Sequence, residues 1–406
     1  MAREKKVEEY DVVIIGGGAA GLTAGIYSGR AKLKTILIEK SLVGGLATYT
    51  NEIENYPGFP EGTTGLGLME LFQKQAKKFG VKFKGTDVKS VDLKGPIKTV
   101  ETFRTTYKAK TVIIASGGRP RITRAENEEE FLFDKGISFC ATCDAAANTG
   151  KDVLVIGSGD AAVEEGMFLT KFANKVIVSV MHEEGKMDCN EIAKAEALEN
   201  PKMEFIWNTV CKRFEGEEHL TNVVLTDLRN GSEVNVPVDT CFEFIGYIPN
   251  TEIFKGIIDM TDRGYVLVND KMETNVEGVF SAGDVTEKFL KQVSTAVGDG
   301  AVAGYAAERY IAETEQYNSQ ILAKNQFVYV YDASCPNCQN KMLEIEAIET
   351  KTEGKISFCK VDVYKSKGLS DRMGVSVFPS VAVVKDGAIV DVLTEDFSQS
   401  VLETYL

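Results

Sequence analysis

The sequence predicts an α/β protein with two similar larger domains and a smaller third domain. Three observations lead to this prediction. Residues 10–39 follow the order strand, glycine-rich turn, helix, strand, and residues 152–180 repeat that order. Residues 326–406 follow another order, β-α-β-α-β-β-α. Strands that alternate with helices indicate parallel sheets covered by helices, and 406 residues are enough for two to four domains.

Composition and charge limit the classes of protein that this chain can belong to. Hydrophobic residues make up 44% and charged residues 26%, as is usual for globular proteins. The formal net charge of −14 repels phosphate backbones, so we expect no nucleic acid partner. The chain has no apolar run of the roughly 18–20 residues that a membrane span needs, and no apolar segment follows its first six residues. We therefore expect a cytoplasmic protein without a membrane partner.

The first domain begins with a buried parallel strand at residues 10–15. A glycine turn at residues 16–21, a helix over residues 22–32 and a strand over residues 35–38 follow. This arrangement matches the whole dinucleotide-binding fingerprint of a Rossmann-like fold, which is more specific than its glycines alone.

Each residue type of the fingerprint has a physical reason. Gly16 permits the tight turn, Gly18 lets the backbone approach a pyrophosphate, and Gly21 lets the helix pack closely on the strand. The helix N-terminus then directs unpaired N–H groups at the phosphates. Glu39 follows 23 residues after Gly16, where a carboxylate accepts hydrogen bonds from ribose hydroxyls and repels a 2′-phosphate. FAD or NAD therefore fits this turn better than NADP.

The second copy of the pattern consists of a strand at residues 153–156, the turn Gly157-Ser-Gly159-Asp-Ala-Ala162, a helix to about residue 172 and a strand at residues 175–180. Two dinucleotide folds in one chain indicate a flavoprotein that binds two nucleotides.

Three further segments complete the first domain. Residues 111–118 predict a closing strand, residues 278–284 a strand with an acidic turn, and residues 294–311 a helix. We therefore expect a discontinuous FAD-binding domain with the second fold inserted. The expected FAD-binding domain is 1–119 and 246–315, the NAD(P)-binding-like domain 120–245, the linker 316–325, and the last domain 326–406.

Four of the eight cysteines form two Cys-x-x-Cys pairs, Cys140/Cys143 and Cys335/Cys338. In a cytosolic protein such a pair indicates redox chemistry or metal binding. Each pair has a redox context in its own domain, so we expect no metal site. The other cysteines (Cys189, Cys211, Cys241 and Cys359) are expected to be ordinary buried or partly buried thiols.

The first 315 or so residues resemble the low-molecular-weight thioredoxin reductases along their whole length. The motifs that carry this resemblance are Gly16-Gly-Gly-Ala-Ala-Gly21, Asn51-Glu-Ile-Glu-Asn-Tyr-Pro-Gly58, Cys140-Ala-Thr-Cys143-Asp144, Gly157-Ser-Gly-Asp-Ala-Ala162 and Gly278-Val-Phe-Ser-Ala-Gly-Asp284. The last 80 residues resemble a minimal thioredoxin without the usual first strand and helix, with Cys335-Pro-Asn-Cys338 and Phe378-Pro379 at the active-site positions. The chain resembles a reductase fused to its own substrate.

The resemblance implies roles for six catalytic residues. In the reductase part, Cys143 is the flavin-side thiol, Cys140 the interchange thiol, and Asp144 the acid that handles the proton. In the thioredoxin-like part, Cys335 is the nucleophile, Cys338 resolves the mixed disulfide, and Pro379 holds the backbone against which a substrate disulfide lies. A helix N-terminus stabilises the thiolate of such a nucleophile.

The resemblance also implies FAD contacts. Lys291-Gln292-Val293 stands where the family has Arg-Gln-Ala, and Gly44-Gly45-Leu46-Ala47 stands where it has Gly-Gly-Gln-Leu, which removes one amide. The expected FAD-binding residues are Gly16, Gly18, Ala19, Ala20, Gly21, Glu39, Lys40, Gly45, Leu46, Asn55, Val88, Ser116, Gly117, Gly283, Asp284, Lys291, Gln292 and Val293.

The second nucleotide fold departs from the family at the segment that follows its second strand. Relatives that use NADPH carry His-Arg-Arg and a further Arg there, which clamp the 2′-phosphate. This chain has Met181 and His182 followed by Glu183 and Glu184, and the carboxylates disfavour a phosphate. Val180 stands at the ribose-acid position, so NADH is not clearly favoured either. The pattern is similar to that of ferredoxin-dependent flavin thioredoxin reductases.

The electron donor therefore stays open, and so does the final substrate. Ferredoxin or another low-potential carrier is favoured over NADH, NADPH and a deazaflavin-type donor. The leading interpretation is an FAD-dependent reductase that passes electrons through both dithiols to disulfide-containing protein targets. The alternatives are an NAD(P)H-dependent reductase that serves a peroxiredoxin and a flavin-bound redox sensor without turnover. By resemblance we expect a homodimer, and a second domain that rotates about hinges near residues 117–121 and 243–248.

Overall fold

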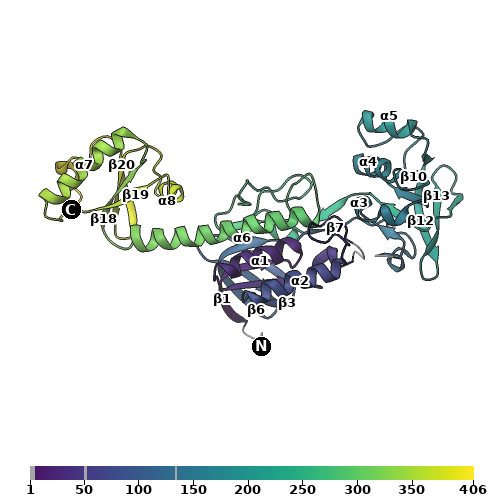
Figure 1. Cartoon of the computed structure of the whole chain (residues 1–406), viewed down its shortest axis with the longest axis horizontal. Helices are drawn as coiled ribbons and strands as arrows, with labels where there is room; N and C mark the ends of the chain where they lie inside the picture. The colour runs from purple at the N-terminus through teal and green to yellow at the C-terminus, as the bar shows by residue number, and fades with distance from the viewer. Residues whose placement is uncertain (1–4, 50–52, 133–134) are drawn as a thin grey trace. The chain divides into compact units, whose positions relative to one another are not determined.

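The computed structural model describes residues 5–49, 53–132 and 135–406 (Figure 1). Two compact units make up the chain, residues 1–307 and residues 308–406, and each is described by itself. Asn51 and Glu52 of the motif at residues 51–58 lie outside the described residues. Within the described part of the chain, no helix is both long and apolar enough to cross a membrane.

A seven-stranded sheet forms the centre of the first unit, in the order β3-β2-β1-β6-β5-β4 with β17 beside β6. Its strands are β1 (Lys6–Ile15), β2 (Thr35–Glu39), β3 (Lys82–Gly85), β4 (Val88–Asp92), β5 (Lys98–Thr102), β6 (Thr105–Ile114) and β17 (Val279–Ser281). Strands β3, β2, β1, β6 and β17 run parallel, whereas β4, β5 and β6 are joined as antiparallel neighbours. The carboxyl ends of the parallel strands therefore meet at one edge, where ligands bind in such sheets.

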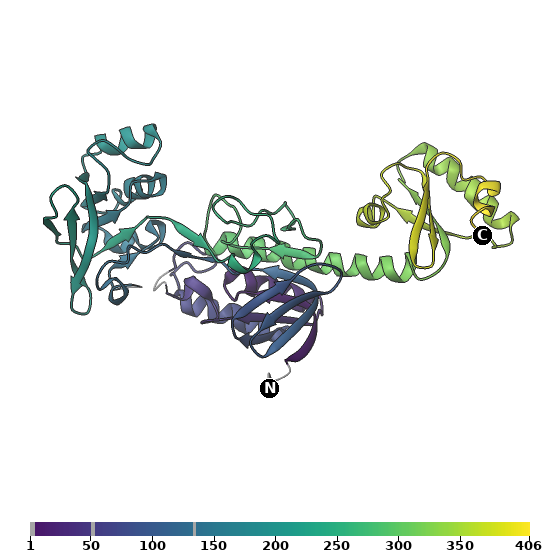
Figure 2. The ribbon, with the colours of Figure 1, turned by 180° about the vertical axis from the view of Figure 1, so that it is seen from behind.

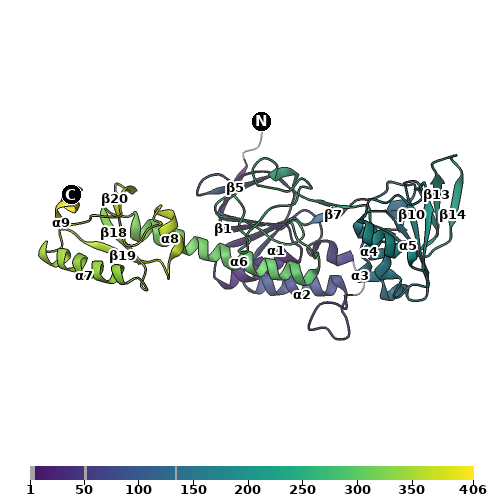
Figure 3. The ribbon, with the colours of Figure 1, turned by 90° about the horizontal axis from the view of Figure 1, so that it is seen from above.

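Three helices lie against this sheet: α1 (Ala19–Arg30), α2 (Gly65–Lys78) and α6 (Val293–Gln316) (Figures 1 and 3). Helices α1 and α6 pack closely at glycines, because a Cβ on Gly300 would lie 2.2 Å from the carbonyl oxygen of Ala20. Two short 3₁₀ helices, η1 (Gly45–Tyr49) and η4 (Glu252–Phe254), complete this part.

A five-stranded parallel sheet in the order β11-β10-β9-β15-β8 forms the centre of the second fold. Its strands are β8 (Ile137–Ser138), β9 (Asp152–Ile156), β10 (Lys175–Val180), β11 (Met203–Trp207) and β15 (Cys241–Glu243). Helices α3 (Ala141–Asp144), α4 (Asp160–Leu169) and α5 (Glu191–Glu199) and the 3₁₀ helices η2 (Glu128–Glu130) and η3 (Ala146–Asn148) accompany it. Strands β7 (Gly118–Pro120) and β16 (Tyr247–Pro249) pair antiparallel, so the chain enters and leaves the second fold side by side (Figure 2).

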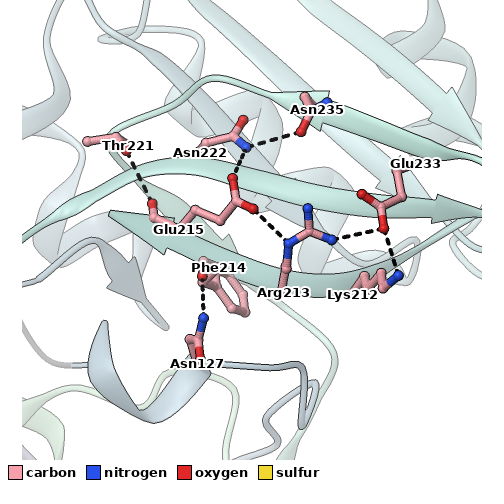
Figure 4. Close-up of polar contacts among 9 residues, drawn as sticks. All are labelled: Asn127, Lys212, Arg213, Phe214, Glu215, Thr221, Asn222, Glu233 and Asn235. Atoms are coloured by element: carbon pink, nitrogen blue, oxygen red, sulfur yellow. Dashed lines mark hydrogen bonds and ion pairs between the residues drawn. The ribbon is translucent and has the colours of Figure 1, made fainter. Parts of the chain in front are cut away.

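An antiparallel meander of β12 (Thr209–Gly216), β13 (Leu220–Asp227) and β14 (Glu233–Val236) packs on the second sheet. Polar residues link its strands through side chains (Figure 4). Arg213 contacts both Glu215 at 2.7 Å and Glu233 at 3.0 Å, and Lys212 contacts Glu233 at 2.7 Å. Asn127 Nδ2 donates to the carbonyl oxygen of Phe214 and so ties the segment before η2 to the meander.

The second unit contains a four-stranded sheet in the order β19-β18-β20-β21. Its strands are β18 (Gln326–Tyr331), β19 (Phe358–Asp362), β20 (Ser380–Lys385) and β21 (Ala388–Leu393), and its helices are α7 (Pro336–Lys351), α8 (Lys367–Arg372) and α9 (Gln399–Glu403). Apolar clusters on both faces bury the sheet between its helices. The Phe378–Pro379 bond is cis.

The architecture confirms the predicted fold class, while several boundaries differ from the expected ones. Helix α1 begins at Ala19, three residues before the expected start, because Ala19 and Ala20 already have helical geometry. Residues 316–325, expected to be a linker, begin inside α6 and continue as the π-helical turn η5 (Tyr317–Ile321). Because the side chain of Ile321 is fully buried, this turn packs into the core of the second unit.

Candidate active site

A cavity lies at the carboxyl ends of β1 and β2, beside the glycine turn of the predicted FAD site. It is lined by Ile15, Gly16, Ile38, Glu39, Lys40, Thr86, Asp87, Val88, Ser116, Asn250, Glu252, Ile253 and Phe254. Five of the predicted FAD-binding residues are therefore brought together here. The sequence prediction did not include Asn250, whose side chain donates to the carbonyl oxygen of Ser116 at 2.9 Å. Its only sequence signal was its position two residues after the expected hinge at residues 243–248.

The glycine turn between β1 and α1 has the geometry that the fingerprint requires. Gly16 has φ +108°, and a Cβ there would lie 2.1 Å from the carbonyl oxygen of Ala115. A Cβ on Gly21 would lie 2.0 Å from the carbonyl oxygen of Gly16. Gly18 is the N-cap of α1 and supplies no capping side chain, so the first N–H groups of the helix are available to a phosphate. Glu39 accepts from Gly17 N–H at 2.7 Å, which fixes its carboxylate beside the turn.

Three glycines outside the fingerprint, Gly44, Gly45 and Gly283, lie close to the glycine turn or to α1. Gly18 and Gly44 form a bridge, which places Gly45 and Leu46 beside the turn. Gly283 follows β17, and a Cβ there would lie 2.8 Å from the Cβ of Ala20.

Asp284 is a second acidic residue at this edge of the sheet. Burial raises the pKa of its carboxyl, and its Oδ1 atom is buried without a hydrogen-bond partner among the described residues. A buried oxygen in this state is satisfied when a ligand hydroxyl donates to it. The turn, the cavity beside it and Asp284 together provide a lining that fits FAD.

Lys291 and Gln292 precede α6 and have different surroundings. Lys291 Nζ lies 4.1 Å from the ring centroid of Tyr265 and 3.3 Å from the carbonyl oxygen of Thr286, and burial lowers its pKa. The Gln292 side chain reaches the dithiol. Its Oε1 accepts from Asn55 at 3.2 Å, and its Nε2 lies 3.1 Å from Thr142 Oγ1 and 4.0 Å from Cys140 Sγ. The structure thus joins three predicted site residues, Asn55, Gln292 and Cys140.

Cys140 and Cys143 form a disulfide at the start of α3, with their Cα atoms 5.3 Å apart. Asp144 ends this short helix, and burial raises the pKa of its carboxyl while a hydrogen bond from Ser138 opposes the rise. The backbone oxygen of Asp144 accepts from Asn148 Nδ2 at 2.8 Å. The disulfide and a buried acid therefore share one turn of helix.

The second dithiol begins α7. Cys335 is the N-cap residue, and its Sγ accepts from the backbone N–H of Cys338 at 3.4 Å. Hydrogen bonds from the side chain and backbone of Cys338 lower the pKa of the Cys335 thiol. Cys338 is fully buried, and burial raises its pKa to about 11. One partly exposed thiol with a lowered pKa beside one buried thiol with a raised pKa is the arrangement of a nucleophile with a resolving cysteine.

The second glycine turn is covered by the segment that follows β10. Asp188 N–H donates to the carbonyl oxygen of Ser158 at 2.9 Å, and the Asp188 carboxylate accepts from Ser158 Oγ at 3.2 Å. His182 Nε2 lies 2.8 Å from that carboxylate. Asp160, in the first turn of α4, accepts from the backbone N–H of Asn190 at 2.8 Å. Two carboxylates therefore lie where the helix N-terminus would meet a pyrophosphate.

Comparison with known proteins places this geometry in a family. Residues 10–300 match the model of the pyridine nucleotide-disulphide oxidoreductases, and residues 309–406 match that of thioredoxin. The chain is 42% identical over 308 residues to a thioredoxin reductase of Peptoclostridium acidaminophilum, covering 74% of this chain and 97% of that protein. It is 40% identical over 314 residues to a thioredoxin reductase of Bacillus subtilis (strain 168), covering 77% and 98%.

Solved structures agree with these relatives. The crystal structure of thioredoxin reductase from Streptococcus pyogenes MGAS5005 matches with a TM-score of 0.71 at 36% identity, covering 75% of this chain and 98% of that one. Thioredoxin reductase from Giardia duodenalis matches with a TM-score of 0.69 at 33% identity, covering 75% and 99%. The chain belongs to the pyridine nucleotide-disulphide oxidoreductase family, as an FAD enzyme of the thioredoxin reductase type with a thioredoxin domain at its C-terminal end.

Proposed function

We propose that this enzyme reduces protein disulfides through two dithiols of its own, Cys140/Cys143 followed by Cys335/Cys338. The observation that carries the proposal is that each dithiol lies at the start of a helix in its own domain. Cys140 and Cys143 are joined as a disulfide beside Gln292 and Asn55 of the FAD site. Cys335 and Cys338 are free thiols, one with a lowered and one with a raised pKa.

The glycine turn, Glu39 and Asp284 would hold FAD, and a bound flavin would be the source of the electron pair needed to open the Cys140–Cys143 disulfide. Asp144 gives its proton to one of the two sulfurs as the Cys140–Cys143 disulfide opens, so that one thiol and one thiolate result. The raised pKa of Asp144 keeps that proton available, because burial disfavours the free carboxylate.

The remaining steps are thiol–disulfide exchange. The Cys140 thiolate attacks Cys335 Sγ of an oxidised thioredoxin domain, and Cys338 leaves as a thiolate that takes up a proton because its pKa is about 11. Cys143 then attacks Cys140 Sγ, reforms the first disulfide and returns its proton to Asp144, while Cys335 leaves as the thiolate. The Cys335 thiolate then attacks one sulfur of a target disulfide, and the other target sulfur leaves as a thiolate. Cys338 gives up its proton and attacks Cys335 Sγ, which reforms the Cys335–Cys338 disulfide and releases the reduced target.

The proposed electron donor is a low-potential carrier of the ferredoxin class. The carboxylates of Asp188 and Asp160 at the second glycine turn support this choice, since both repel a pyrophosphate. Glu183 and Glu184 stand just beyond the positions at which the family resemblance places the two arginines of NADPH-dependent relatives, and those arginines are absent here. Anaerobic loss of flavin absorbance, with reduced ferredoxin, NADPH and NADH offered separately, tests the donor. Fast reduction by ferredoxin alone is expected, and fast reduction by either nicotinamide would contradict the proposal.

A glycine variant sharpens this test. A Cβ on Gly159 meets no described atom within 4 Å, so Gly159→Ala leaves the fold intact. In a working nucleotide site that Cβ would obstruct the approach of the pyrophosphate. Turnover of Gly159→Ala is therefore expected to equal that of the parent enzyme, whereas a loss of about tenfold or more would show that the second turn binds the donor.

A further inference from the structure

Ser138 connects the dithiol to the buried acid Asp144. Its Oγ donates to Asp144 Oδ2 at 2.5 Å and accepts from the backbone N–H of Cys140 at 3.2 Å. Ser138 is buried and is the last residue of β8, whose hydrogen bonds to β15 fix its position. One hydroxyl therefore holds both ends of α3, the cysteine that begins it and the acid that ends it.

The single proton of the Ser138 hydroxyl bears on which of the two carboxyl oxygens of Asp144 carries the acidic proton. A serine hydroxyl has a single proton to donate. Where Ser138 gives that proton to Oδ2 of Asp144, Oδ2 acts as an acceptor and the acidic proton of the carboxyl is left to Oδ1. We propose that Ser138 is a positioning residue for the disulfide exchange, which directs the protonated oxygen of Asp144 toward the sulfurs. This proposal rests on the proton-donor role that the proposed function gives to Asp144.

Among the described residues, no charged side chain contributes to the pKa shift of Asp144. Asn148 Nδ2 donates to its backbone oxygen, and Asn148 Oδ1 accepts from Thr240 Oγ1 at 2.7 Å, so the backbone of α3 is tied to the segment before β15. The titratable groups on its own helix are Cys140 and Cys143, which are joined as the disulfide. Ser138 is therefore the neighbour that lowers the pKa of Asp144 against the opposing effect of burial.

Removing the hydroxyl has two expected effects. The carboxyl loses its orientation, which lowers kcat by about tenfold, the equivalent of one hydrogen bond to an ionisable group. The carboxylate also loses a stabilising donor, so the pKa of Asp144 rises further. A general acid works only while protonated, so the alkaline limb of the kcat profile moves to higher pH.

The test uses the full-length FAD enzyme with electrochemically reduced methyl viologen as electron source and insulin disulfides as substrate, which makes it independent of the natural donor. kcat is measured against pH for Ser138→Ala, Ser138→Thr, Asp144→Asn and the control Ser179→Ala. Ser179 is a buried serine of β10 whose hydroxyl contacts Thr209 at 2.9 Å, so its removal reports the general cost of losing such a bond. Flavin absorbance and the melting temperature confirm that each variant is folded.

The expected result is that Asp144→Asn loses at least about 100-fold in kcat together with its alkaline limb. Ser138→Ala should lose about tenfold with the limb moved to higher pH, Ser138→Thr should restore both, and Ser179→Ala should match the parent. If Asp144→Asn is strongly impaired while Ser138→Ala matches Ser179→Ala in rate and profile, Ser138 has no positioning role. If Asp144→Asn is itself fully active, the proton-donor role of Asp144 is wrong, and the proposal for Ser138 is overturned with it.

Discussion

Gln292 Nε2 lies 3.1 Å from Thr142 Oγ1, so the segment that precedes α6 is hydrogen-bonded to the helix that carries the first dithiol. Oε1 of the same Gln292 side chain accepts from Asn55 Nδ2. Gln292 thus contacts residues of both nucleotide-binding folds. Because β7 and β16 are the paired strands that connect these folds, any rotation of the second fold must break this contact.

Replacing Thr142 by valine removes the acceptor while keeping the shape of the side chain. One neutral hydrogen bond contributes about 0.5–1.5 kcal/mol, so amide exchange in residues 286–292 is expected to accelerate by roughly two- to tenfold. Hydrogen–deuterium exchange with mass spectrometry measures this. Thr149→Val is the matched control, since the Thr149 hydroxyl donates to the nearby carbonyl oxygen of Ala146. Equal exchange in both variants would show that the contact does not hold the two folds.

The two thiols of the thioredoxin domain should react with iodoacetamide in different pH ranges. Cys335 has a lowered pKa because Cys338 donates to its sulfur at the start of α7. Burial raises the pKa of Cys338 to about 11. After reduction, Cys335 is expected to be alkylated at pH 7 and Cys338 to stay unmodified until the pH approaches 11. Peptide mapping after a timed pulse shows which residue carries the label, and preferential labelling of Cys338 at neutral pH would refute the assignment.

Glu243 makes the stability of the second fold depend on pH. Burial and the neighbouring Glu128 raise the pKa of its carboxyl to about 9, from an ordinary value near 4.5. The native state therefore holds a proton that the unfolded chain releases, so this stabilisation is complete below about pH 4.5 and is lost as the pH rises toward 9. Glu243→Gln has no such proton to lose and should raise Tm at pH 8 by roughly 5 °C, with little change at pH 5.

The single tryptophan, Trp207, lies on β11, so a melting temperature followed by tryptophan fluorescence reports on the second fold. Its fluorescence is followed during heating at several pH values. Glu233→Gln is a suitable comparison because Glu233 has a pKa lowered to about 2 by Arg213 and Lys212 on the exposed meander (Figure 4). Exposed ion pairs contribute little, so its Tm should change by much less. A Glu243→Gln profile parallel to that of the parent would show that the carboxyl is ionised in the folded protein.

Gly21→Ala should abolish FAD retention. The added Cβ would lie 2.0 Å from the carbonyl oxygen of Gly16, so the turn and α1 must separate where the pyrophosphate binds. Gly85→Ala is the control, because a Cβ there meets no described atom within 4 Å. The flavin-to-protein absorbance ratio after desalting is expected to fall at least about tenfold in Gly21→Ala only. Full flavin content in Gly21→Ala would contradict the assignment of this turn to FAD.

Local signals were sufficient for the elements that build the sites. The apolar runs and glycines around Gly16 and Gly157 specify strand, turn and helix within a few residues, and the structure contains both of these strand–turn–helix motifs. Strands β3, β4 and β5 and the meander β12–β14 were not predicted, since their alternating polar and apolar residues have weak local signals. Their pairing depends on residues distant in the chain.

The site residues, too, divide into those that local sequence identifies and those that depend on contacts between distant parts of the chain. Cys140, Cys143, Cys335 and Cys338 were recognisable from spacing alone. Ser138 and Thr142 became informative only when hydrogen bonds joined them to Asp144 and Gln292, 150 residues apart in the second case. Asn250 joined the FAD cavity for the same reason, because the pairing of β7 with β16 brings it to Ser116.

The transfer of electrons between the two dithiols is tested most directly by trapping its intermediate. In the double variant Cys143→Ser, Cys338→Ser neither resolving thiol remains, so the mixed disulfide between Cys140 and Cys335 cannot be released. Peptide mapping by mass spectrometry after mild oxidation is expected to find this disulfide as the main cross-link, and non-reducing electrophoresis shows whether it forms within one chain or between two. A main cross-link of Cys140 to Cys189, Cys211, Cys241 or Cys359, or none at all, would contradict the relay.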